Sequence, residues 1–137
     1  MNIQSAIIEG TNILKSKYIQ TAQLDTEILM AKALGKDRKY IVLNNNKFLK
    51  DKNLKIFEKL INERASRKPI AYLINKKFFW NFEFFVTSDT LIPRPDTELI
   101  IEQILNLTKH KSKMNILDIG VGSGCILLTI LKERKNF

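Results

Sequence analysis

Residues that build disulfides and metal sites are nearly absent from this sequence. Its 137 residues include one cysteine, Cys125, and one histidine, His110. One cysteine excludes an internal disulfide and fits a reducing compartment, and the two residues together are too few for a zinc site. No apolar run is long enough to span a membrane, and residues 1–5 lack the layout of a secretory signal. We therefore expect a cytoplasmic location, with no metal and no membrane partner.

Acidic residues are also scarce relative to basic ones. The chain has 23 Lys and Arg against 14 Asp and Glu, which gives a formal net charge of +9. With 45% hydrophobic and 27% charged residues, the composition is that of a soluble globular protein. A basic surface favours contact with RNA, a ribosome or an acidic protein, but charge does not specify a fold.

Apolar residues at helical spacing run through the first half of the chain. Residues 3–14 carry Ile3, Ile7 and Leu14 on one face of an expected helix. Thr21 is expected to cap a second helix that stops at Gly35. The apolar stripe expected for that second helix consists of Leu24, Ile28, Ala31 and Leu34. Further helical pieces are expected at 40–43, from about 50 to before 69, and at 70–73. Residues 1–74 therefore predict a small helical bundle.

The composition changes after residue 74. Residues 78–86, Phe-Phe-Trp-Asn-Phe-Glu-Phe-Phe-Val, are dense in aromatic and β-favouring side chains. Asn81 can occupy the turn of a hairpin, because asparagine tolerates a left-handed backbone. The aromatic residues are interpreted as packing residues in preference to ligand-stacking ones.

A proline-flanked arginine follows in residues 91–98, Leu-Ile-Pro-Arg-Pro-Asp-Thr-Glu. Pro95 suits the first turn of a helix, whose positive end favours Asp96 and Glu98. That helix is expected to bury one face, formed by Leu99, Ile100, Ile104 and Leu107. Arg94 is either an ordinary solvated charge or a group with a fixed hydrogen-bond partner.

The most informative stretch begins with a predicted buried strand at 114–119. Gly120, Gly122 and Gly124 follow at alternate positions, and an apolar helix starting at Cys125 comes next. Glycine allows close approach of the backbone, and the first amides of a helix point at an anionic group. This order predicts a ligand site, although a tight turn without a ligand would use the same residues.

The spacing of the glycines distinguishes a dinucleotide-binding loop from a loop that binds S-adenosylmethionine. A dinucleotide fingerprint has the pattern G-x-G-x-x-G, whereas Gly124 comes one position too early and Cys125 occupies the required place. The pattern from Asp118 to Gly124, D-x-G-x-G-x-G, resembles the loop after the first strand of S-adenosylmethionine-dependent methyltransferases.

The whole chain resembles the HemK/PrmC family, which methylates the glutamine amide of the Gly-Gly-Gln motif in peptide chain release factors. The resemblance lies in motifs at 25–29, 34–35, 68–73, 79–80, 84–86, 91–98 and 117–124, in this order. Three residues depart from the family pattern. Asn75 replaces a usual glycine, Phe78 replaces a usual acidic residue, and Val121 replaces a usual threonine.

The resemblance implies an α+β chain with an N-terminal helical bundle at 1–74 that binds release factor. A β-hairpin linker at 75–92 and the incomplete start of a Rossmann-like class I methyltransferase domain at 93–137 follow. It implies S-adenosylmethionine as cofactor and peptide chain release factors as partners, and the basic surface adds RNA or the ribosome as a further option. The implied cofactor-binding residues are Gly120, Val121, Gly122, Ser123 and Gly124.

The family's Asn-Pro-Pro-Tyr motif, which orients the substrate amide, does not occur in this sequence. We therefore assign no catalytic residue and expect the chain alone to be inactive and to bind cofactor weakly. Two alternatives stay open. One is a non-catalytic basic module that binds release factor or RNA and comes from a split or truncated gene. The other is a nucleic-acid adenine methyltransferase, which the bundle and residues 91–98 disfavour.

Overall fold

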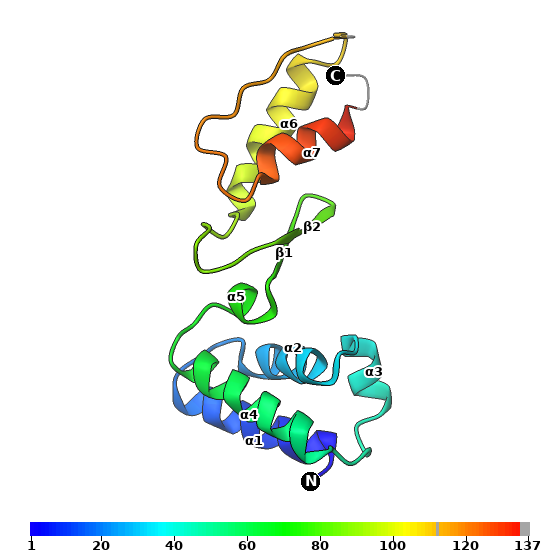
Figure 1. Ribbon diagram of the computed structural model, residues 1–137, viewed down its shortest axis with the longest axis vertical. Coiled ribbons are helices and arrows are strands. Elements are labelled where there is room, and N and C mark those ends of the chain that lie inside the picture. The colour runs from blue at the N-terminus through cyan, green and yellow to red at the C-terminus, as the bar shows by residue number, and fades with distance from the viewer. Residues whose placement is uncertain (112, 135–137) are drawn as a thin grey trace. The chain divides into compact units, whose positions relative to one another are not determined.

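The computed structural model describes residues 1–111 and 113–134. The chain divides into two compact units, Met1–Ile74 and Asn75–Phe137, which are called unit 1 and unit 2 below. Figure 1 shows the elements of each unit in chain order. Helices predominate, and the strands that the structure describes form one two-stranded antiparallel sheet, so the chain is α+β. No helix of the described residues is long and apolar enough to cross a membrane.

Unit 1 is a helical bundle in which α1, α2 and α4 all pack against one another. Its helices are α1 (Ile3–Ser16), α2 (Ala22–Leu34), α3 (Arg38–Leu43), α4 (Asp51–Ala65) and α5 (Ile70–Ile74). The central side chains of its core are Leu14, Leu29, Met30, Ile41 and Ile61, each nearly inaccessible to solvent. Burial of such side chains is the main stabilising contribution to the bundle.

The ends of the helices in unit 1 follow local sequence signals. Asn2 caps α1, its side-chain oxygen accepting a hydrogen bond from the Ser5 amide at 2.8 Å. Helix α2 starts after Thr21 and stops at Gly35, whose φ of 62° is left-handed, so both predicted ends are confirmed. The Thr21 side chain makes no capping hydrogen bond to the helix amides, and its hydroxyl donates to Asp25 Oδ2 at 3.0 Å.

The buried face of α2 differs from the predicted stripe. Leu24 is exposed, whereas the polar residues Asp25 and Thr26 are buried. Arg64 of α4 donates to Asp25 at 2.7 Å, and the Thr26 hydroxyl donates to the Ala22 carbonyl at 2.7 Å. Apolar periodicity does not predict this face, because two of its buried residues are polar. Polar side chains are buried when hydrogen-bond partners are available, and the spacing of apolar residues does not reveal those partners.

Gly10 lies where α1 passes closest to α2 and α4. A Cβ atom at this position would lie 3.0 Å from Phe57 Cζ, 3.0 Å from Thr26 Cγ2 and 3.1 Å from Ile61 Cδ1. Those three side chains are themselves buried, so they have little room to move.

We expect Gly10→Val to lower the free energy of unfolding of unit 1 by about 1–3 kcal/mol, because it overpacks this crossing. Urea denaturation followed by far-UV circular dichroism measures the loss. Ile8→Val on the exposed side of the same helix is the control, and an equal loss in both variants would contradict the close packing.

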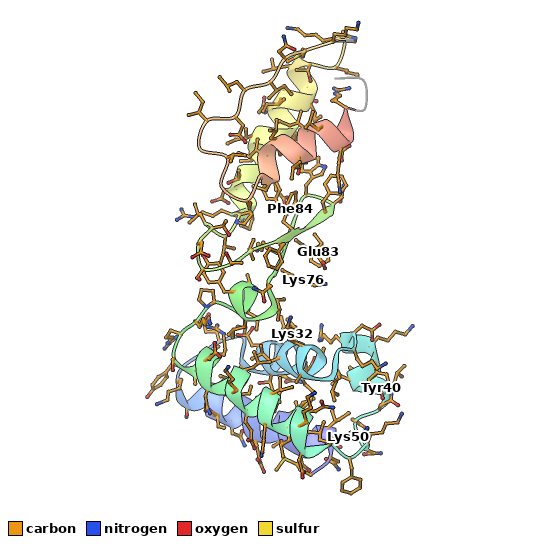
Figure 2. All side chains as sticks on the ribbon, viewed as in Figure 1. Lys32, Tyr40, Lys50, Lys76, Glu83 and Phe84 are labelled. Carbon is orange, nitrogen blue, oxygen red and sulfur yellow. The ribbon has the colours of Figure 1, made fainter. Side chains whose placement is uncertain are left out.

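Unit 2 combines a hairpin with two helices. Its elements are β1 (Lys76–Phe79), β2 (Phe82–Phe85), the short 3-10 helix η1 (Pro95–Thr97), α6 (Glu98–Leu107) and α7 (Cys125–Glu133). The strands are antiparallel, with Lys77 opposite Phe84 and Phe79 opposite Phe82. Figure 2 labels Lys76 and Glu83, which form an ion pair at 2.8 Å on the hairpin.

The hairpin buries one of its two faces. Phe79 and Phe84 are buried with their rings edge to face at a centroid distance of 6.1 Å. They belong to a core with Ile101 of α6 and Ile130 of α7. Phe78 and Phe85 lie on the opposite, exposed face. The interpretation of the buried aromatics as packing residues is therefore confirmed.

Two backbone positions of the hairpin are left-handed. Asn75 has φ 58°, so asparagine is tolerated where the family usually has glycine, as expected. Asn81 lies in the turn of the hairpin, as expected, but the left-handed backbone expected for it is found at Trp80, whose φ is 55°. Two hydrogen bonds hold Trp80 there: its amide donates to Glu98 at 2.7 Å and its indole donates to Glu133 at 2.8 Å.

The predicted buried strand at 114–119 is not formed. This segment is extended without ladder partners, and Leu117 and Ile119 are 84% and 88% exposed. A strand needs a neighbour for its amides and carbonyls, and the only strands among the described residues, β1 and β2, pair with each other. The first strand of the expected Rossmann-like domain is therefore absent from this structure.

The apolar faces of the two helices in unit 2 also differ from the predictions. In α6 the fully buried residue is Ile101, whereas the predicted face leaves Leu99, Ile100 and Leu107 exposed. Helix α7 buries Cys125, Thr129 and Ile130 but exposes Leu128 and Leu131, so it is not mostly buried. A helix is buried only where other elements pack against it. In unit 2 each helix packs against the hairpin and one other helix, so only one of its faces is buried.

Candidate functional site

The glycine loop between residue 119 and α7 has an alternating backbone. Gly120, Gly122 and Gly124 have φ values of 83°, 54° and 75°, all left-handed, whereas Val121 and Ser123 do not have positive φ. Residues with a Cβ atom are strained in this conformation. Alternation of left- and right-handed residues turns successive amides toward one side, which is how backbone anion sites are built.

Two of the three glycines border open space. A Cβ atom on Gly120 would meet no atom within 4 Å, and one on Gly122 would meet only the Gly120 carbonyl oxygen at 3.9 Å. At Gly124 a Cβ atom would lie 3.1 Å from Cδ1 of Leu128. The first two glycines therefore leave room for a ligand against the backbone, and the third allows α7 to start close to the loop.

The N-terminus of α7 faces this loop without a side-chain cap. Gly124 is the N-cap residue and its carbonyl accepts the first helical hydrogen bond, from the Leu128 amide at 2.9 Å. The Gly124 amide donates to the Val121 carbonyl at 2.8 Å, which closes the turn. The amides of residues 125–127 precede any helical acceptor, so they and the helix dipole favour a negatively charged group at this end.

A packed core fixes the position of α7 and with it the position of the loop. Cys125 and Ile130 lie in the cluster that includes Ile101 of α6 and Phe79 and Phe84 of the hairpin. Cys125 is thus a buried packing residue, as the sequence analysis predicted, and not an exposed thiol. The indole of Trp80 ties the hairpin to the end of α7 through Glu133.

Asp118 stands directly before the loop and has an unsatisfied oxygen. Its Oδ2 atom is buried and accepts no hydrogen bond from the described residues. Buried polar atoms are nearly always paired in folded proteins, so this oxygen can accept a donor that the chain does not supply. Among the described residues the site contains an acceptor at Asp118, an open backbone at Gly120 and Gly122, and free amides at α7.

Other residues considered from the sequence do not join this site. Arg94 is exposed, and its guanidinium has no hydrogen-bond or ion-pair partner among the described residues. His110 is exposed in the turn after α6, as expected. Val121 is exposed and Ser123 is half-buried within the loop. No group of acidic, His and Cys side chains suited to a metal ion occurs among residues 1–111 and 113–134.

Comparisons with known proteins identify the family to which the chain is related. A family model described as PrmC N-terminal domain matches residues 5–74. The chain is 36% identical over 137 residues to a release factor glutamine methyltransferase of Leptospira interrogans, covering 99% of this chain and 48% of that protein. Proteins of the same name from Clostridium botulinum and Geobacter sulfurreducens are 35% and 40% identical, over 95% and 88% of this chain.

The same two relatives are matched over 46% and 42% of their own length. The chain thus spans about half the length of the curated relatives that it matches. The family model covers most of unit 1, and the similarity to the relatives continues through the glycine loop. The chain belongs to the PrmC family of release factor glutamine methyltransferases.

Proposed function

We propose that this chain supplies the release-factor-binding bundle and the cofactor loop of a methyltransferase that uses S-adenosylmethionine. The proposed substrate is the glutamine amide of the Gly-Gly-Gln motif in peptide chain release factors. The observation that carries the proposal is the open glycine loop at the N-terminus of α7, in a chain similar throughout to proteins named release factor glutamine methyltransferase. The reaction would take place in the cytoplasm, where release factors act.

Each part of the chain has a proposed role. Residues 1–74 bind the release factor, residues 75–92 form the linking hairpin, and residues 93–137 begin a Rossmann-like methyltransferase domain. In a full domain of this kind, neighbouring strands would pair with the segment at 114–119. Its exposed Leu117 and Ile119 support this role, because both would lie on one face of the sheet and be covered by a helix packed on that face.

The proposed cofactor-binding residues are Gly120, Val121, Gly122, Ser123 and Gly124. When bound, S-adenosylmethionine supplies a methyl group activated by its sulfonium sulfur. The open backbone at Gly120 and Gly122 admits the methionine part of the cofactor, and the free amides at the start of α7 attract its carboxylate. The free Asp118 oxygen, two residues before Gly120, can accept a hydrogen bond from a donor group of the ligand.

Transfer to an amide nitrogen makes demands that these residues do not meet. An amide nitrogen is a weak nucleophile, so an enzyme must orient it and stabilise the charge that develops in the transition state. No residue in the described part of this chain is assigned that task. We therefore expect the 137 residues alone to transfer no methyl group, with radiolabelled methyl transfer to purified release factor as the assay. Methyl transfer by the chain that exceeds the signal of a blank lacking the chain would contradict this expectation.

A chimera tests the proposed function directly. Residues 1–137 replace the matching part of the Leptospira interrogans relative, and methyl transfer to release factor is measured. We expect activity, and we expect Gly122→Val in the chimera to lower it by about 100-fold, because the displaced backbone misplaces the methyl donor. A control chimera carries the corresponding segment of the Clostridium botulinum relative. An active control together with an inactive test chimera would contradict the proposal.

A further inference from the structure

One surface of unit 1 combines exposed apolar side chains with unpaired lysines. It covers the end of α3 and the loop that leads to α4, and it is called the α3 surface. Its residues are Val42, Leu43 and Phe48, with Lys39, Lys47 and Lys50 around them. Exposed apolar residues scattered singly are ordinary, but here three that are each more than half exposed lie within seven positions of chain. Such a concentration of exposed apolar side chains is typical of interaction sites.

The backbone under Phe48 is held in place. The Ile3 amide donates to the Lys47 carbonyl at 2.9 Å, and the Leu49 amide donates to the Met1 carbonyl at 3.0 Å. Between these bonds, Phe48 forms an isolated antiparallel bridge with Asn2. The side chain is nevertheless 83% exposed. A large apolar side chain on a fixed backbone loses little conformational entropy when a partner covers it, which suits an anchor residue.

The lysines of the α3 surface are free of ion pairs among the described residues. Residues 36–50 contain five basic side chains and one acidic side chain, Asp37, whose carboxylate caps α3. Arg38 is paired with Glu27, whereas Lys39, Lys47 and Lys50 form no ion pair within the described residues. Figure 2 labels Tyr40 and Lys50, which lie at the same end of unit 1. An apolar patch with this charge around it complements a surface that carries carboxylates.

We propose that the α3 surface docks an apolar, acid-rimmed surface of the release factor, an inference that rests on the function proposed above. A protein partner fits better than a nucleic acid, because Val42 and Leu43 are aliphatic, so Phe48 alone among the three apolar side chains offers a ring on which a base could stack. The ring of Tyr40 is already covered by Lys36 and Lys47 at 5.4 and 5.3 Å. Helix α3 has 6 residues, which is too short for a helix lying in a membrane interface.

The test measures the dissociation constant between the 137-residue chain and purified release factor at two salt concentrations. We expect the double variant Leu43→Ala with Phe48→Ala to weaken binding by about tenfold or more, because the anchor is lost. Lys39→Glu with Lys50→Glu is expected to weaken binding by about tenfold and to reduce its dependence on salt. Both double variants change exposed side chains, so circular dichroism should give unchanged helix content.

Matched controls come from the opposite end of α1. Tyr18 is 86% exposed with φ 56°, so Tyr18→Asn removes an equally exposed ring without backbone strain. Lys15→Glu with Lys17→Glu makes the same change of net charge as the test pair. We expect each control to change the dissociation constant by less than about twofold, since neither removes a contact to the partner.

The outcomes separate this inference from the proposed function. Unchanged binding by both α3-surface variants, with tight binding by the unmodified chain, would overturn the inference and leave the proposed function standing. Absence of binding by the unmodified chain would overturn the proposed partner, and the inference with it. If the α3 surface bound RNA and not the release factor, the inference would also be overturned.

Discussion

Asp25→Ala is expected to lower the free energy of unfolding of unit 1 by about 3–5 kcal/mol, because it leaves a buried guanidinium without its partner. Arg64 Nε and Asp25 Oδ2 are 2.7 Å apart, and the two side chains are 16% and 5% exposed. The same carboxylate oxygen accepts the Thr21 hydroxyl at 3.0 Å, so the substitution removes one hydrogen bond between α2 and α4 and one at the start of α2.

A second ion pair of the same helix is the control for Asp25→Ala. Glu27 also lies on α2 and pairs with Arg38 at 2.6 Å, but the Arg38 side chain is 56% exposed. We expect Glu27→Ala to cost less than about 1 kcal/mol, since solvent screens that pair. Urea denaturation followed by circular dichroism compares the two variants. Equal small losses would mean that the Asp25–Arg64 pair is not buried in solution.

Phe79→Ala is expected to destabilise unit 2 by about 3–5 kcal/mol, because it opens a cavity where the hairpin meets α6 and α7. The ring is 1% exposed and packs edge to face on Phe84. The chain has one tryptophan, Trp80, and it is the next residue, so its fluorescence reports on this core directly. We expect the urea midpoint measured by tryptophan fluorescence to fall, and the urea midpoint of unit 1 measured by circular dichroism to stay unchanged.

The neighbouring residue provides the control for Phe79→Ala. Phe78 has the same side chain but points to the opposite face of the hairpin and is 68% exposed. Phe78→Ala should therefore change the free energy of unfolding by less than about 0.5 kcal/mol. A similar shift of the fluorescence midpoint in both variants would contradict the assignment of the buried face.

Local sequence signals predicted the parts of this fold that local chemistry determines. Thr21 and Gly35 mark the ends of α2, and Asn75 occupies a left-handed position that glycine usually takes. Alternate glycines predicted the tight turn before α7, and the left-handed φ values of Gly120, Gly122 and Gly124 show why glycine is needed there. Aromatic density between 78 and 86 predicted the hairpin in the same way.

Features that depend on distant partners were missed. Asp25 is buried because Arg64 meets it from 39 positions away, and no pattern within α2 indicates that. Trp80 takes the left-handed turn position that Asn81 was expected to hold, because Glu98 and Glu133 bind its two nitrogen donors. The strand at 114–119 was predicted from its apolar residues, but pairing requires a neighbour that those residues do not encode. The unsatisfied oxygen of Asp118 likewise follows from packing and not from sequence.

Nuclear magnetic resonance titration of the 137-residue chain with S-adenosylmethionine tests the central claim most directly, because it reports on each backbone amide separately. The amides of residues 120–127 should shift in a saturable way, and Gly122→Val should abolish those shifts while the resonances of unit 1 stay unchanged. Adenosine alone, which lacks the methionine part, should move these amides less. Saturable shifts confined to residues outside the loop, or identical shifts in Gly122→Val, would contradict the claim that the glycine loop binds the methyl donor.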